Sequence, residues 1–338
     1  MPAGPRHDWE SLAQVAWTYA KSTDGGHQAL ADWVEVLSLS DPSGKCSRAD
    51  LVRRLRQDLD KDDGSGEKFS QDKASDVFAC LSERSDSYWG KGYPFKLDAD
   101  QDCVLFDSKK KDTLYIFFLV LSYVDPVPVV RGDIGFSGAQ LFEQLCVQAL
   151  NRLFPPAAFQ DDSAQTFHLG NPSTTGMPGL FWKKVDFLCA RISEGRQNGY
   201  RPPDSGKKRE AGDDGIDIIH RRGFSDQRGS QFLISASCAT GRSDWHDKRG
   251  ECNPGAWTSE HMLRGVLAQP ALSQCCFVPR MVPVDKWEGL SRHAGAVIDR
   301  CRLAHILEGV DTDVVKSASR WLWSVVPNGR EASRGTAT

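Results

Sequence analysis

The residues best suited to chemistry lie in two short, mostly apolar stretches. The first, "DDGIDIIHRR", places Asp217 inside an apolar segment that is typical of a strand. Because side chains alternate along a strand, Asp217 and Arg221 are expected to face one way and Ile218 and His220 the other. An aspartate in an apolar strand is costly to bury without a partner. A cation, a metal ion or several hydrogen-bond donors are therefore expected beside Asp217.

The second stretch, "QFLISASCATG", follows a polar loop and predicts another strand. Its alternation places Ser237 and Ala239 on the face opposite to Cys238. Asp217 and Ser237 are expected to meet on one side of the two-stranded ribbon, with Ala239 the next residue along. Phosphodiester hydrolysis uses a hard cation held by carboxylate and carbonyl oxygens, and a lysine often assists. Two strands and a helix at a sheet edge can supply such a set.

These stretches resemble the restriction-endonuclease-like, or PD-(D/E)XK, nuclease superfamily, and within it the Mrr-like branch. The motif of that branch, Asp-Gly-Gly-Ile-Asp-Val before a strand that ends in Gln-Cys-Lys, is similar to "DDGIDI" at 213–218. An upstream helix with a Phe-Glu pair after a glycine is matched by Gly138, Phe142 and Glu143. The resemblance covers residues 135–245 and leaves the N-terminal region outside.

The resemblance implies a role for each matching position. Asp217 would be the principal metal ligand, Glu143 would lie beside it and act through water, and the carbonyl of Cys238 would be a further ligand. The implied ion is Mg²⁺, or Mn²⁺. Ser237 occupies the position of the family's Gln or Glu, and Ala239 that of its lysine. A hydroxyl is a weaker metal ligand than a carboxylate, and a methyl group cannot replace an ammonium.

The missing ammonium needs another source. Lys248 is the first candidate, because it follows the strand closely and lies three residues after Trp245. Arg221 is the second, because it shares a strand face with Asp217. Lys183 and Lys184, on the preceding predicted helix, come third.

The composition is typical of a soluble globular protein. The chain has 338 residues, 40% of them hydrophobic and 26% charged, with a net charge of −3. Any nucleic-acid-binding surface must therefore be local. The longest apolar run, at 113–124, is too short to span a bilayer. The ten cysteines form no CxxC pair, which favours a reduced, cytoplasmic protein without a structural zinc.

The apolar spacing predicts a series of elements along the chain. The segment at 60–73 is polar and is expected to be a loop, and residues 289–308 are expected to form one long helix. Arg300, Arg302 and His305 on that helix are candidates for lining a nucleic-acid groove, and the alternative for them is a solvated face. Further helices are predicted at 9–20, 27–39, 47–59, 74–89, 139–154, 179–194, 257–269 and 312–326, and a strand at 275–283.

Together these elements predict two domains. Residues 1–125 would form a mostly helical domain for docking of a partner or of DNA. Residues 126–327 would form an α/β restriction-endonuclease-like domain, with a mixed sheet flanked by helices. Residues 328–338 are small and polar and are expected to be a disordered tail.

The leading functional hypothesis is a divalent-metal-dependent DNA endonuclease. The resemblance implies an effector of a bacterial anti-phage defence system. One alternative is a catalytically degenerate module that keeps the fold and binds nucleic acid or a partner protein without cleaving. Another is a nuclease that stays inactive until a partner ATPase or sensor assembles it. An oligomer is compatible with any of these, and no membrane association is expected.

Overall fold

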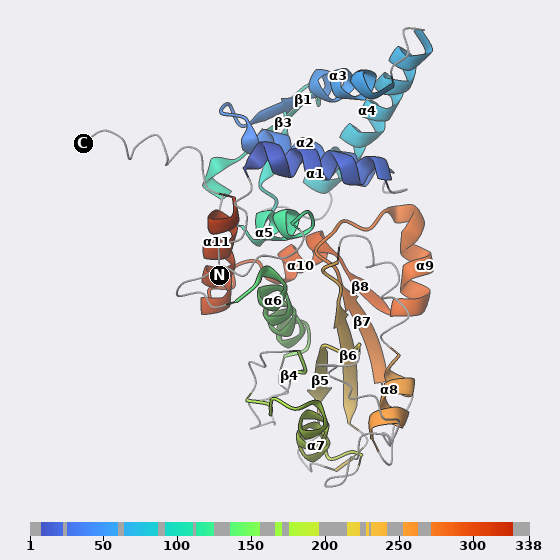
Figure 1. Ribbon diagram of the computed structural model, residues 1–338, viewed down its shortest axis with the longest axis vertical. Helices are drawn as coiled ribbons and strands as arrows, with labels where there is room; N and C mark the ends of the chain where they lie inside the picture. Colours follow the sequence, from blue (N-terminus) through green and yellow to red (C-terminus); the bar gives the residue numbers. More distant parts are fainter. Residues whose placement is uncertain are drawn as a thin grey trace, which may run out of the picture. The chain divides into compact units, whose positions relative to one another are not determined.

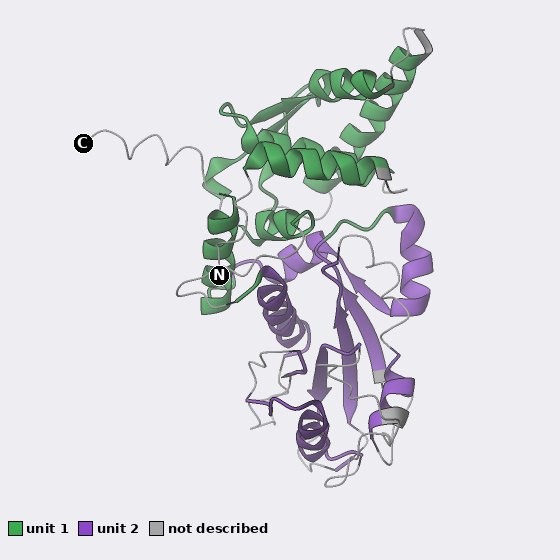
Figure 2. Cartoon of the chain, viewed as in Figure 1, with its two compact units in different colours: residues 1–137, 280–283, 310–338 green, residues 138–279, 284–309 purple. Residues whose placement is uncertain are grey.

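A computed structural model shows two compact units (Figure 2). Unit 1 comprises residues 1–137, 280–283 and 310–338, and unit 2 comprises residues 138–279 and 284–309. The structure describes residues 8–22, 26–59, 64–86, 92–110, 113–124, 136–155, 166–170, 176–195, 215–223, 228–229, 231–241, 253–262 and 272–326.

Unit 1 combines helices with a small antiparallel sheet in the order β1-β3-β2 (Figure 1). Its elements are α1 (Trp9–Ser22), α2 (Gly26–Ser40), β1 (Lys45–Ser47), α3 (Arg48–Leu59), α4 (Gly64–Asp86), β2 (Phe95–Leu97), β3 (Cys103–Phe106), η1 (Ser108–Lys110), α5 (Leu114–Leu121) and α11 (Asp313–Val325). The helices expected at 9–20, 27–39, 47–59 and 312–326 are confirmed.

The loop predicted at 60–73 is wrong from residue 64 onward, because α4 begins at Gly64. Gly66, Ser70 and Ala74 are buried at four-residue spacing and continue the helix face that carries Val77 and Phe78. Small residues at this spacing let a helix pack closely without large apolar side chains. The first half of α4 therefore lacks the spaced large apolar residues that predict a helix, and its sequence resembles a polar loop.

A buried network of charges ties α2 to α4 inside unit 1. The guanidinium of Arg84 donates to Asp32 at 2.9 Å and to Glu35 at 2.7 Å. The hydroxyls of Tyr93 and Tyr115 also donate to Glu35. Burial lowers the pKa of Arg84, but the surrounding carboxylates outweigh it and raise that pKa well above its usual value. Arg84 therefore keeps its positive charge at any physiological pH.

The last helix of the chain belongs to unit 1. In α5 every residue after Leu114 is buried, and the ring of Phe117 contacts that of Trp321 on α11 at 5.4 Å. The structure thus divides the chain differently from the predicted ranges 1–125 and 126–327, since residues 310–326 return to the first unit. The predicted tail at 328–338 lies outside the described residues.

Unit 2 is built on a five-stranded mixed sheet in the order β4-β5-β6-β7-β8 (Figure 1). The pairs β4–β5 and β5–β6 are antiparallel, and β6–β7 and β7–β8 are parallel. The mixed α/β class is confirmed. The elements are α6 (Gly138–Leu153), β4 (Thr166–His168), α7 (Phe181–Ile192), β5 (Ile218–Arg222), β6 (Phe232–Cys238), α8 (Pro254–His261), β7 (Leu272–Phe277), α9 (Val284–Ala294), β8 (Ala296–Ile298) and α10 (Arg300–Ile306).

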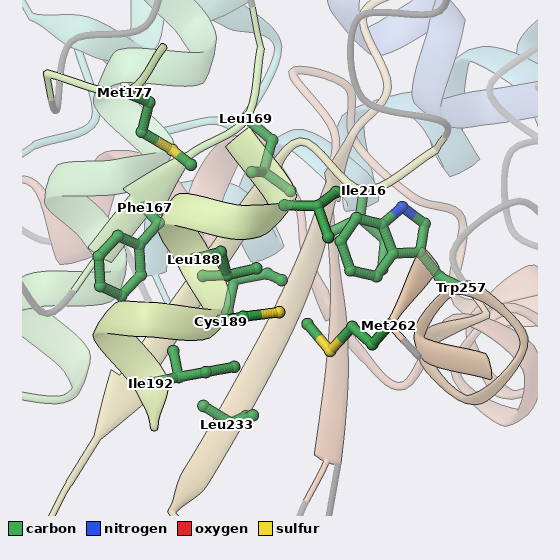
Figure 3. Close-up of a cluster of buried hydrophobic side chains, with 12 residues drawn as sticks. Phe167, Leu169, Met177, Leu188, Cys189, Ile192, Ile216, Leu233, Trp257 and Met262 are labelled. Carbon is green, nitrogen blue, oxygen red and sulfur yellow. The ribbon is translucent and has the colours of Figure 1, made fainter. Parts of the chain in front are cut away.

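The two faces of this sheet pack against different helices. Ile219 and Leu233 share one face and pack with Leu188 and Ile192 of α7 in an apolar cluster (Figure 3). On the other face the thiol of Cys238 reaches that of Cys146 on α6. Ile219 and Leu233 therefore follow the predicted alternation, and α6 and α7 fix the β5–β6 hairpin from both sides.

The single long helix predicted at 289–308 is wrong. Gly295 has a φ of 72° and ends α9, after which β8 forms and Asp299 caps α10. A residue with positive φ cannot continue a right-handed helix. Arg300 is fully buried and donates to the carbonyl of Pro279, and Arg302 lies over the ring of Trp287. Burial therefore removes Arg300 from any nucleic-acid surface, whereas Arg302 and His305 are exposed.

Two further features concern the described residues of both units. Nine cysteines lie in the described ranges, and all are free thiols. Within those ranges no helix combines the length and the apolar character that crossing a bilayer requires.

Candidate active site at the β4–β6 edge of unit 2

The sheet topology brings the ends of three strands to one edge. Because β5 is antiparallel to both of its neighbours, the start of β5 lies beside the ends of β4 and β6. The chain just beyond the ladders stays paired there: the N–H of Leu169 donates to the carbonyl of Asp217 at 2.7 Å, and the N–H of Asp217 donates to Ala236 at 3.0 Å. Residues 168–170, 217 and 237–239 thus meet at this edge.

Asp217 is half-buried at the start of β5, and its carboxylate reaches the backbone of β6. Its Oδ2 accepts a hydrogen bond from the N–H of Cys238 at 2.6 Å. The donor expected from the sequence is therefore a backbone amide. In a strand the N–H and C=O of one residue point to the same side. The Cys238 carbonyl, an implied ligand, accordingly faces the side on which Asp217 lies.

Glu143 projects from α6 toward the end of β4. Its Oε2 lies 2.6 Å from Nε2 of His168, which is buried, while the Glu143 side chain is 19% exposed. This pairing was not expected from the sequence. The histidine holds one carboxylate oxygen and leaves Glu143 partly accessible to solvent.

The two carboxylates predicted to act together lie near the same pair of thiols. Burial raises the pKa of Cys146, and the charges of Glu143 and Asp217 raise it further. Burial likewise raises the pKa of Cys238 well above its usual value, with contributions from Cys146, Asp217 and Glu143. Asp217, at the start of β5, and Glu143, on α6, therefore both lie close enough to these thiols to interact with them electrostatically. Both thiols stay protonated at neutral pH, so the Cys238 carbonyl is a better candidate ligand than its sulfur.

The two departures from the nuclease motif are both buried. The paired register of β5 and β6 ends at Ile218 and Ala236, and the N–H of Asp217 bonds to the Ala236 carbonyl. Ile216 packs in the same apolar cluster as Ile219, so the strict alternation predicted around Asp217 is wrong. Ser237 is 3% exposed, and its Oγ has no hydrogen-bond partner among the described residues. Ala239 is fully buried, and its N–H donates to the carbonyl of Phe277. The site therefore has an unsatisfied hydroxyl where the family has an acid or amide.

Of the candidates for the missing cation, Arg221 is excluded by position. It lies four residues along β5 from Asp217, roughly 14 Å at about 3.4 Å per residue. Its Nη1 donates instead to the carbonyl of Arg191 near the C-terminal end of α7. Lys248 lies outside the described residues, as does Trp245. Lys183 is exposed, with its ammonium over the ring of Trp182.

Lys184 is the candidate lysine that the structure brings to the edge. It is 1% exposed, and its Nζ donates to the carbonyls of Leu169 and, at 3.1 Å, of Gly170. Gly170 in turn lies against Glu143 and His168 so closely that a Cβ there would overlap both side chains. The Lys184 ammonium thus bonds to the same backbone segment, Leu169 and Gly170, that packs against Glu143.

The residues at this edge suit a magnesium ion better than a zinc ion. Within the described ranges, no group of three or more His, Cys, Asp or Glu side chains is arranged to hold a metal. A structural or catalytic zinc needs at least three such ligands. Mg²⁺ is often held by only one or two carboxylates, with water and substrate phosphate completing the shell. Asp217, Glu143 and the Cys238 carbonyl meet that smaller requirement.

Three supporting residues were missed or ranked low from the sequence. His168 and Gly170 lie in "TFHLG", a stretch too short to show strand alternation, and β4 was not predicted. Lys184 was ranked third because its predicted helix face was not known. A charged residue flanked by Val185 and Leu188 on the apolar face of α7 was the available signal.

Comparisons with protein-family models, with curated proteins and with solved structures found no match to this chain.

Proposed function

We propose that unit 2 is a divalent-metal-dependent DNA endonuclease that hydrolyses phosphodiester bonds at the β4–β6 edge. The observation that carries the proposal is that the Asp217 carboxylate accepts from the backbone of Cys238, while Glu143 on α6 lies close to the same residue. The strand order and the flanking helices α6 and α7 also agree with a restriction-endonuclease-like fold. The resemblance associates such nucleases with bacterial defence against phage, and we propose that setting for this protein.

Each residue at the edge has a defined part in this proposal. Asp217 and Glu143, with the Cys238 carbonyl, would hold Mg²⁺, which when bound polarises the phosphate and lowers the pKa of the attacking water. Asp217 is oriented by the Cys238 N–H, and Glu143 by His168. Oriented groups lose less entropy in the reaction than free ones.

Lys184 supplies the positive charge that Ala239 cannot. Its ammonium polarises the carbonyls of Leu169 and Gly170 and contributes a positive potential to the edge where negative charge develops on the phosphate. A buried charge acts more strongly than an exposed one, because less water screens it.

The test of the metal-holding residues is cleavage of plasmid and linear DNA with Mg²⁺ or Mn²⁺. Asp217→Asn keeps the shape of the side chain but removes its charge, and we expect a loss of about 100-fold or more in rate. Asp285→Asn, at an exposed aspartate of α9, is the matched control. Equal rates for Asp217→Asn and the wild type would refute the assignment.

The source of the ammonium is tested by two neighbouring substitutions. Lys184→Met removes the buried charge, and Lys183→Met removes the adjacent exposed one. We expect only the first to slow cleavage, with folding checked by circular dichroism. If Lys248→Ala abolishes cleavage and Lys184→Met leaves it unchanged, the charge comes from the segment after β6.

A second candidate function is a non-cleaving module that binds nucleic acid or a partner. The burial of Ser237 and Ala239 at the two altered motif positions favours it, because neither offers a charge to a substrate. This candidate predicts DNA binding, measured in EDTA, that equals binding in Mg²⁺, and no cleavage by the wild type. A nuclease that waits for an ATPase or sensor partner would instead cleave once that partner is added.

A further inference from the structure

Unit 1 contains a groove between α3 and α4 that the proposed function does not use. It encloses a volume of about 660 Å³, and we call it the α3–α4 groove. One face of α3, the facing side of α4 and the end of the β2–β3 turn line it. The lining residues include Arg48, Val52, Arg53, Arg56, Gln57 and Gln71. Its volume lies within the range of ligand pockets in proteins.

The α3 helix presents its basic residues to this groove because of their spacing. Arg53 and Arg56 are three residues apart and therefore lie on one helix face. Arg48 forms part of the wall: it pairs with Asp102 at 2.9 Å and donates to Ser75 and Gln101. The start of α3 is fixed by the reciprocal bonds between Ser47 and Asp50. The arginines therefore project from a well-anchored helix.

Arg53 and Arg56 have unused hydrogen-bonding capacity. Each makes one ion pair through Nη2, Arg53 with Asp50 and Arg56 with Glu67. The Nε and Nη1 groups of both have no hydrogen-bond partner among the described residues. Their side chains are 67% and 44% exposed, and exposed ion pairs contribute little stability. A ligand can therefore displace Asp50 or Glu67 at small cost.

The chemistry of the groove fits a phosphate group. A guanidinium matches the oxygens of a phosphate with two parallel N–H bonds, and two guanidiniums can hold one phosphate from two sides. The amides of Gln57 and Gln71 add neutral donors. The groove also lies between two consecutive helices separated only by residues 60–63, an arrangement that many proteins place against the DNA backbone.

We propose that the α3–α4 groove binds a phosphate group carried by DNA or by a free nucleotide, with Arg53 and Arg56 as the main contacts. The site is independent of the β4–β6 edge, because it lies wholly in unit 1. The carboxylates of Glu67 and Asp102 beside it oppose the binding of a polyanion. These carboxylates make the affinity for phosphate depend on salt concentration and on the displacement of Glu67 from Arg56.

The test uses the full chain in EDTA, so that no cleavage takes place. Binding of a short labelled DNA duplex is measured by fluorescence anisotropy over a range of salt, and binding of ATP by calorimetry. The variant is Arg53→Gln with Arg56→Gln. The matched control is Arg292→Gln, at an exposed arginine of α9 that pairs with Glu288 in the same way. Circular dichroism confirms that both variants are folded.

The two probes separate the sources of the phosphate. If DNA is the ligand, the double variant should weaken duplex binding and lower the slope of log affinity against log salt by about 2, with ATP unaffected. If a nucleotide is the ligand, the double variant should weaken ATP binding by about 100-fold. Equal binding by variant and wild type for both probes, or no binding by the wild type, would overturn the proposal. The cleavage assay of Asp217→Asn is unaffected by either result.

Discussion

Asp217 and Glu143 are positions that local sequence patterns are able to identify. Both depend on short-range information, since a strand motif fixes Asp217 and an amphipathic helix fixes Glu143. The residues that position Asp217 and Glu143 cannot be identified in the same way. His168, Gly170 and Lys184 act through contacts that depend on where β4 ends, and three strand residues carry no recognisable period. The proposed ligands of the site were thus predictable, and the residues that hold them were not.

The close approach of Gly170 to Glu143 and His168 yields a residue-scale prediction. In Gly170→Ala the new methyl group overlaps both side chains, so Glu143 must move. We expect a stability loss of about 1–3 kcal/mol from overpacking and an apparent Mn²⁺ affinity lowered by about tenfold or more. Urea unfolding and calorimetric titration of Mn²⁺ measure the two effects.

A glycine of α9 provides the control for that substitution. A Cβ at Gly289 meets no atom within 4 Å. Gly289→Ala should therefore stabilise the protein by about 0.5–1 kcal/mol, because alanine favours a helix. If Gly170→Ala behaved like this control, the close approach of Gly170 to Glu143 and His168 would matter neither for stability nor for metal binding.

His220 gives a second prediction at this scale, on pH. Burial lowers the pKa of His220 to about 4, helped by the charge of Arg222 and opposed by the Phe154 carbonyl. Its Nδ1 lies 2.7 Å from the hydroxyl of Thr166. An unfolded histidine titrates near pH 6.5, so from there downward the unfolded chain takes up a proton that the folded protein does not. The stability that His220 contributes is full above about pH 6.5 and is lost as the pH falls toward 4.

The measurement compares urea unfolding of the wild type and His220→Gln at pH 7 and pH 5. We expect the wild type to lose about 2 kcal/mol more than the variant over this interval, because glutamine does not titrate. The same loss in both proteins would show that His220 titrates normally in the folded state.

Among elements, helices with a clear apolar stripe were predicted well and those with unusual faces were not. The helices α1, α2, α3, α6 and α11 follow three- and four-residue spacing closely. The first half of α4 packs through Gly66, Ser70 and Ala74, which have too little apolar surface to mark a helix face. The α9–β8–α10 segment has a continuous helical pattern, and only the conformation of Gly295 breaks it. Backbone conformation at one residue is not visible in the pattern of its neighbours.

The charge network between α2 and α4 gives a prediction at the element scale. Arg84→Met leaves Asp32 and Glu35 buried without their cation. We expect the free energy of unfolding to fall by about 3–5 kcal/mol, because an uncompensated buried charge is costly. Arg53→Met, at an exposed ion pair, should change it by less than about 1 kcal/mol. Chemical unfolding followed by circular dichroism measures both, and similar values would contradict a structural role for the network.

At the scale of the whole molecule, the sequence indicated two units but not how the chain is shared between them. The boundary near residue 137 falls within the proline- and glycine-rich stretch at 124–138, where composition changes visibly. The return of residues 310–326 to unit 1 depends on the contact of α11 with α5. A contact between residues 204 positions apart leaves no local trace in the sequence.

Trp321→Ala tests this division. Trp321 is fully buried and packs on Phe117, so its loss should destabilise unit 1 by about 3–5 kcal/mol. We expect faster hydrogen exchange at the amides of α5 and α11, with β5 and β6 as protected as in the wild type. Equal loss of protection in both units would show that they unfold together.

The return of α11 also sets an order for synthesis on the ribosome. Every residue of unit 2 has been added by position 309, but unit 1 still lacks the helix that covers α5. Chains usually fold from the N-terminal domain onward as they emerge. Here the unit that starts first is completed last, and a product that stops soon after residue 309 would carry the whole β4–β6 edge beside an incomplete unit 1. Synthesis of α11 is therefore the step that separates a chain with the α11–α5 contact from a fragment that already contains the proposed nuclease site.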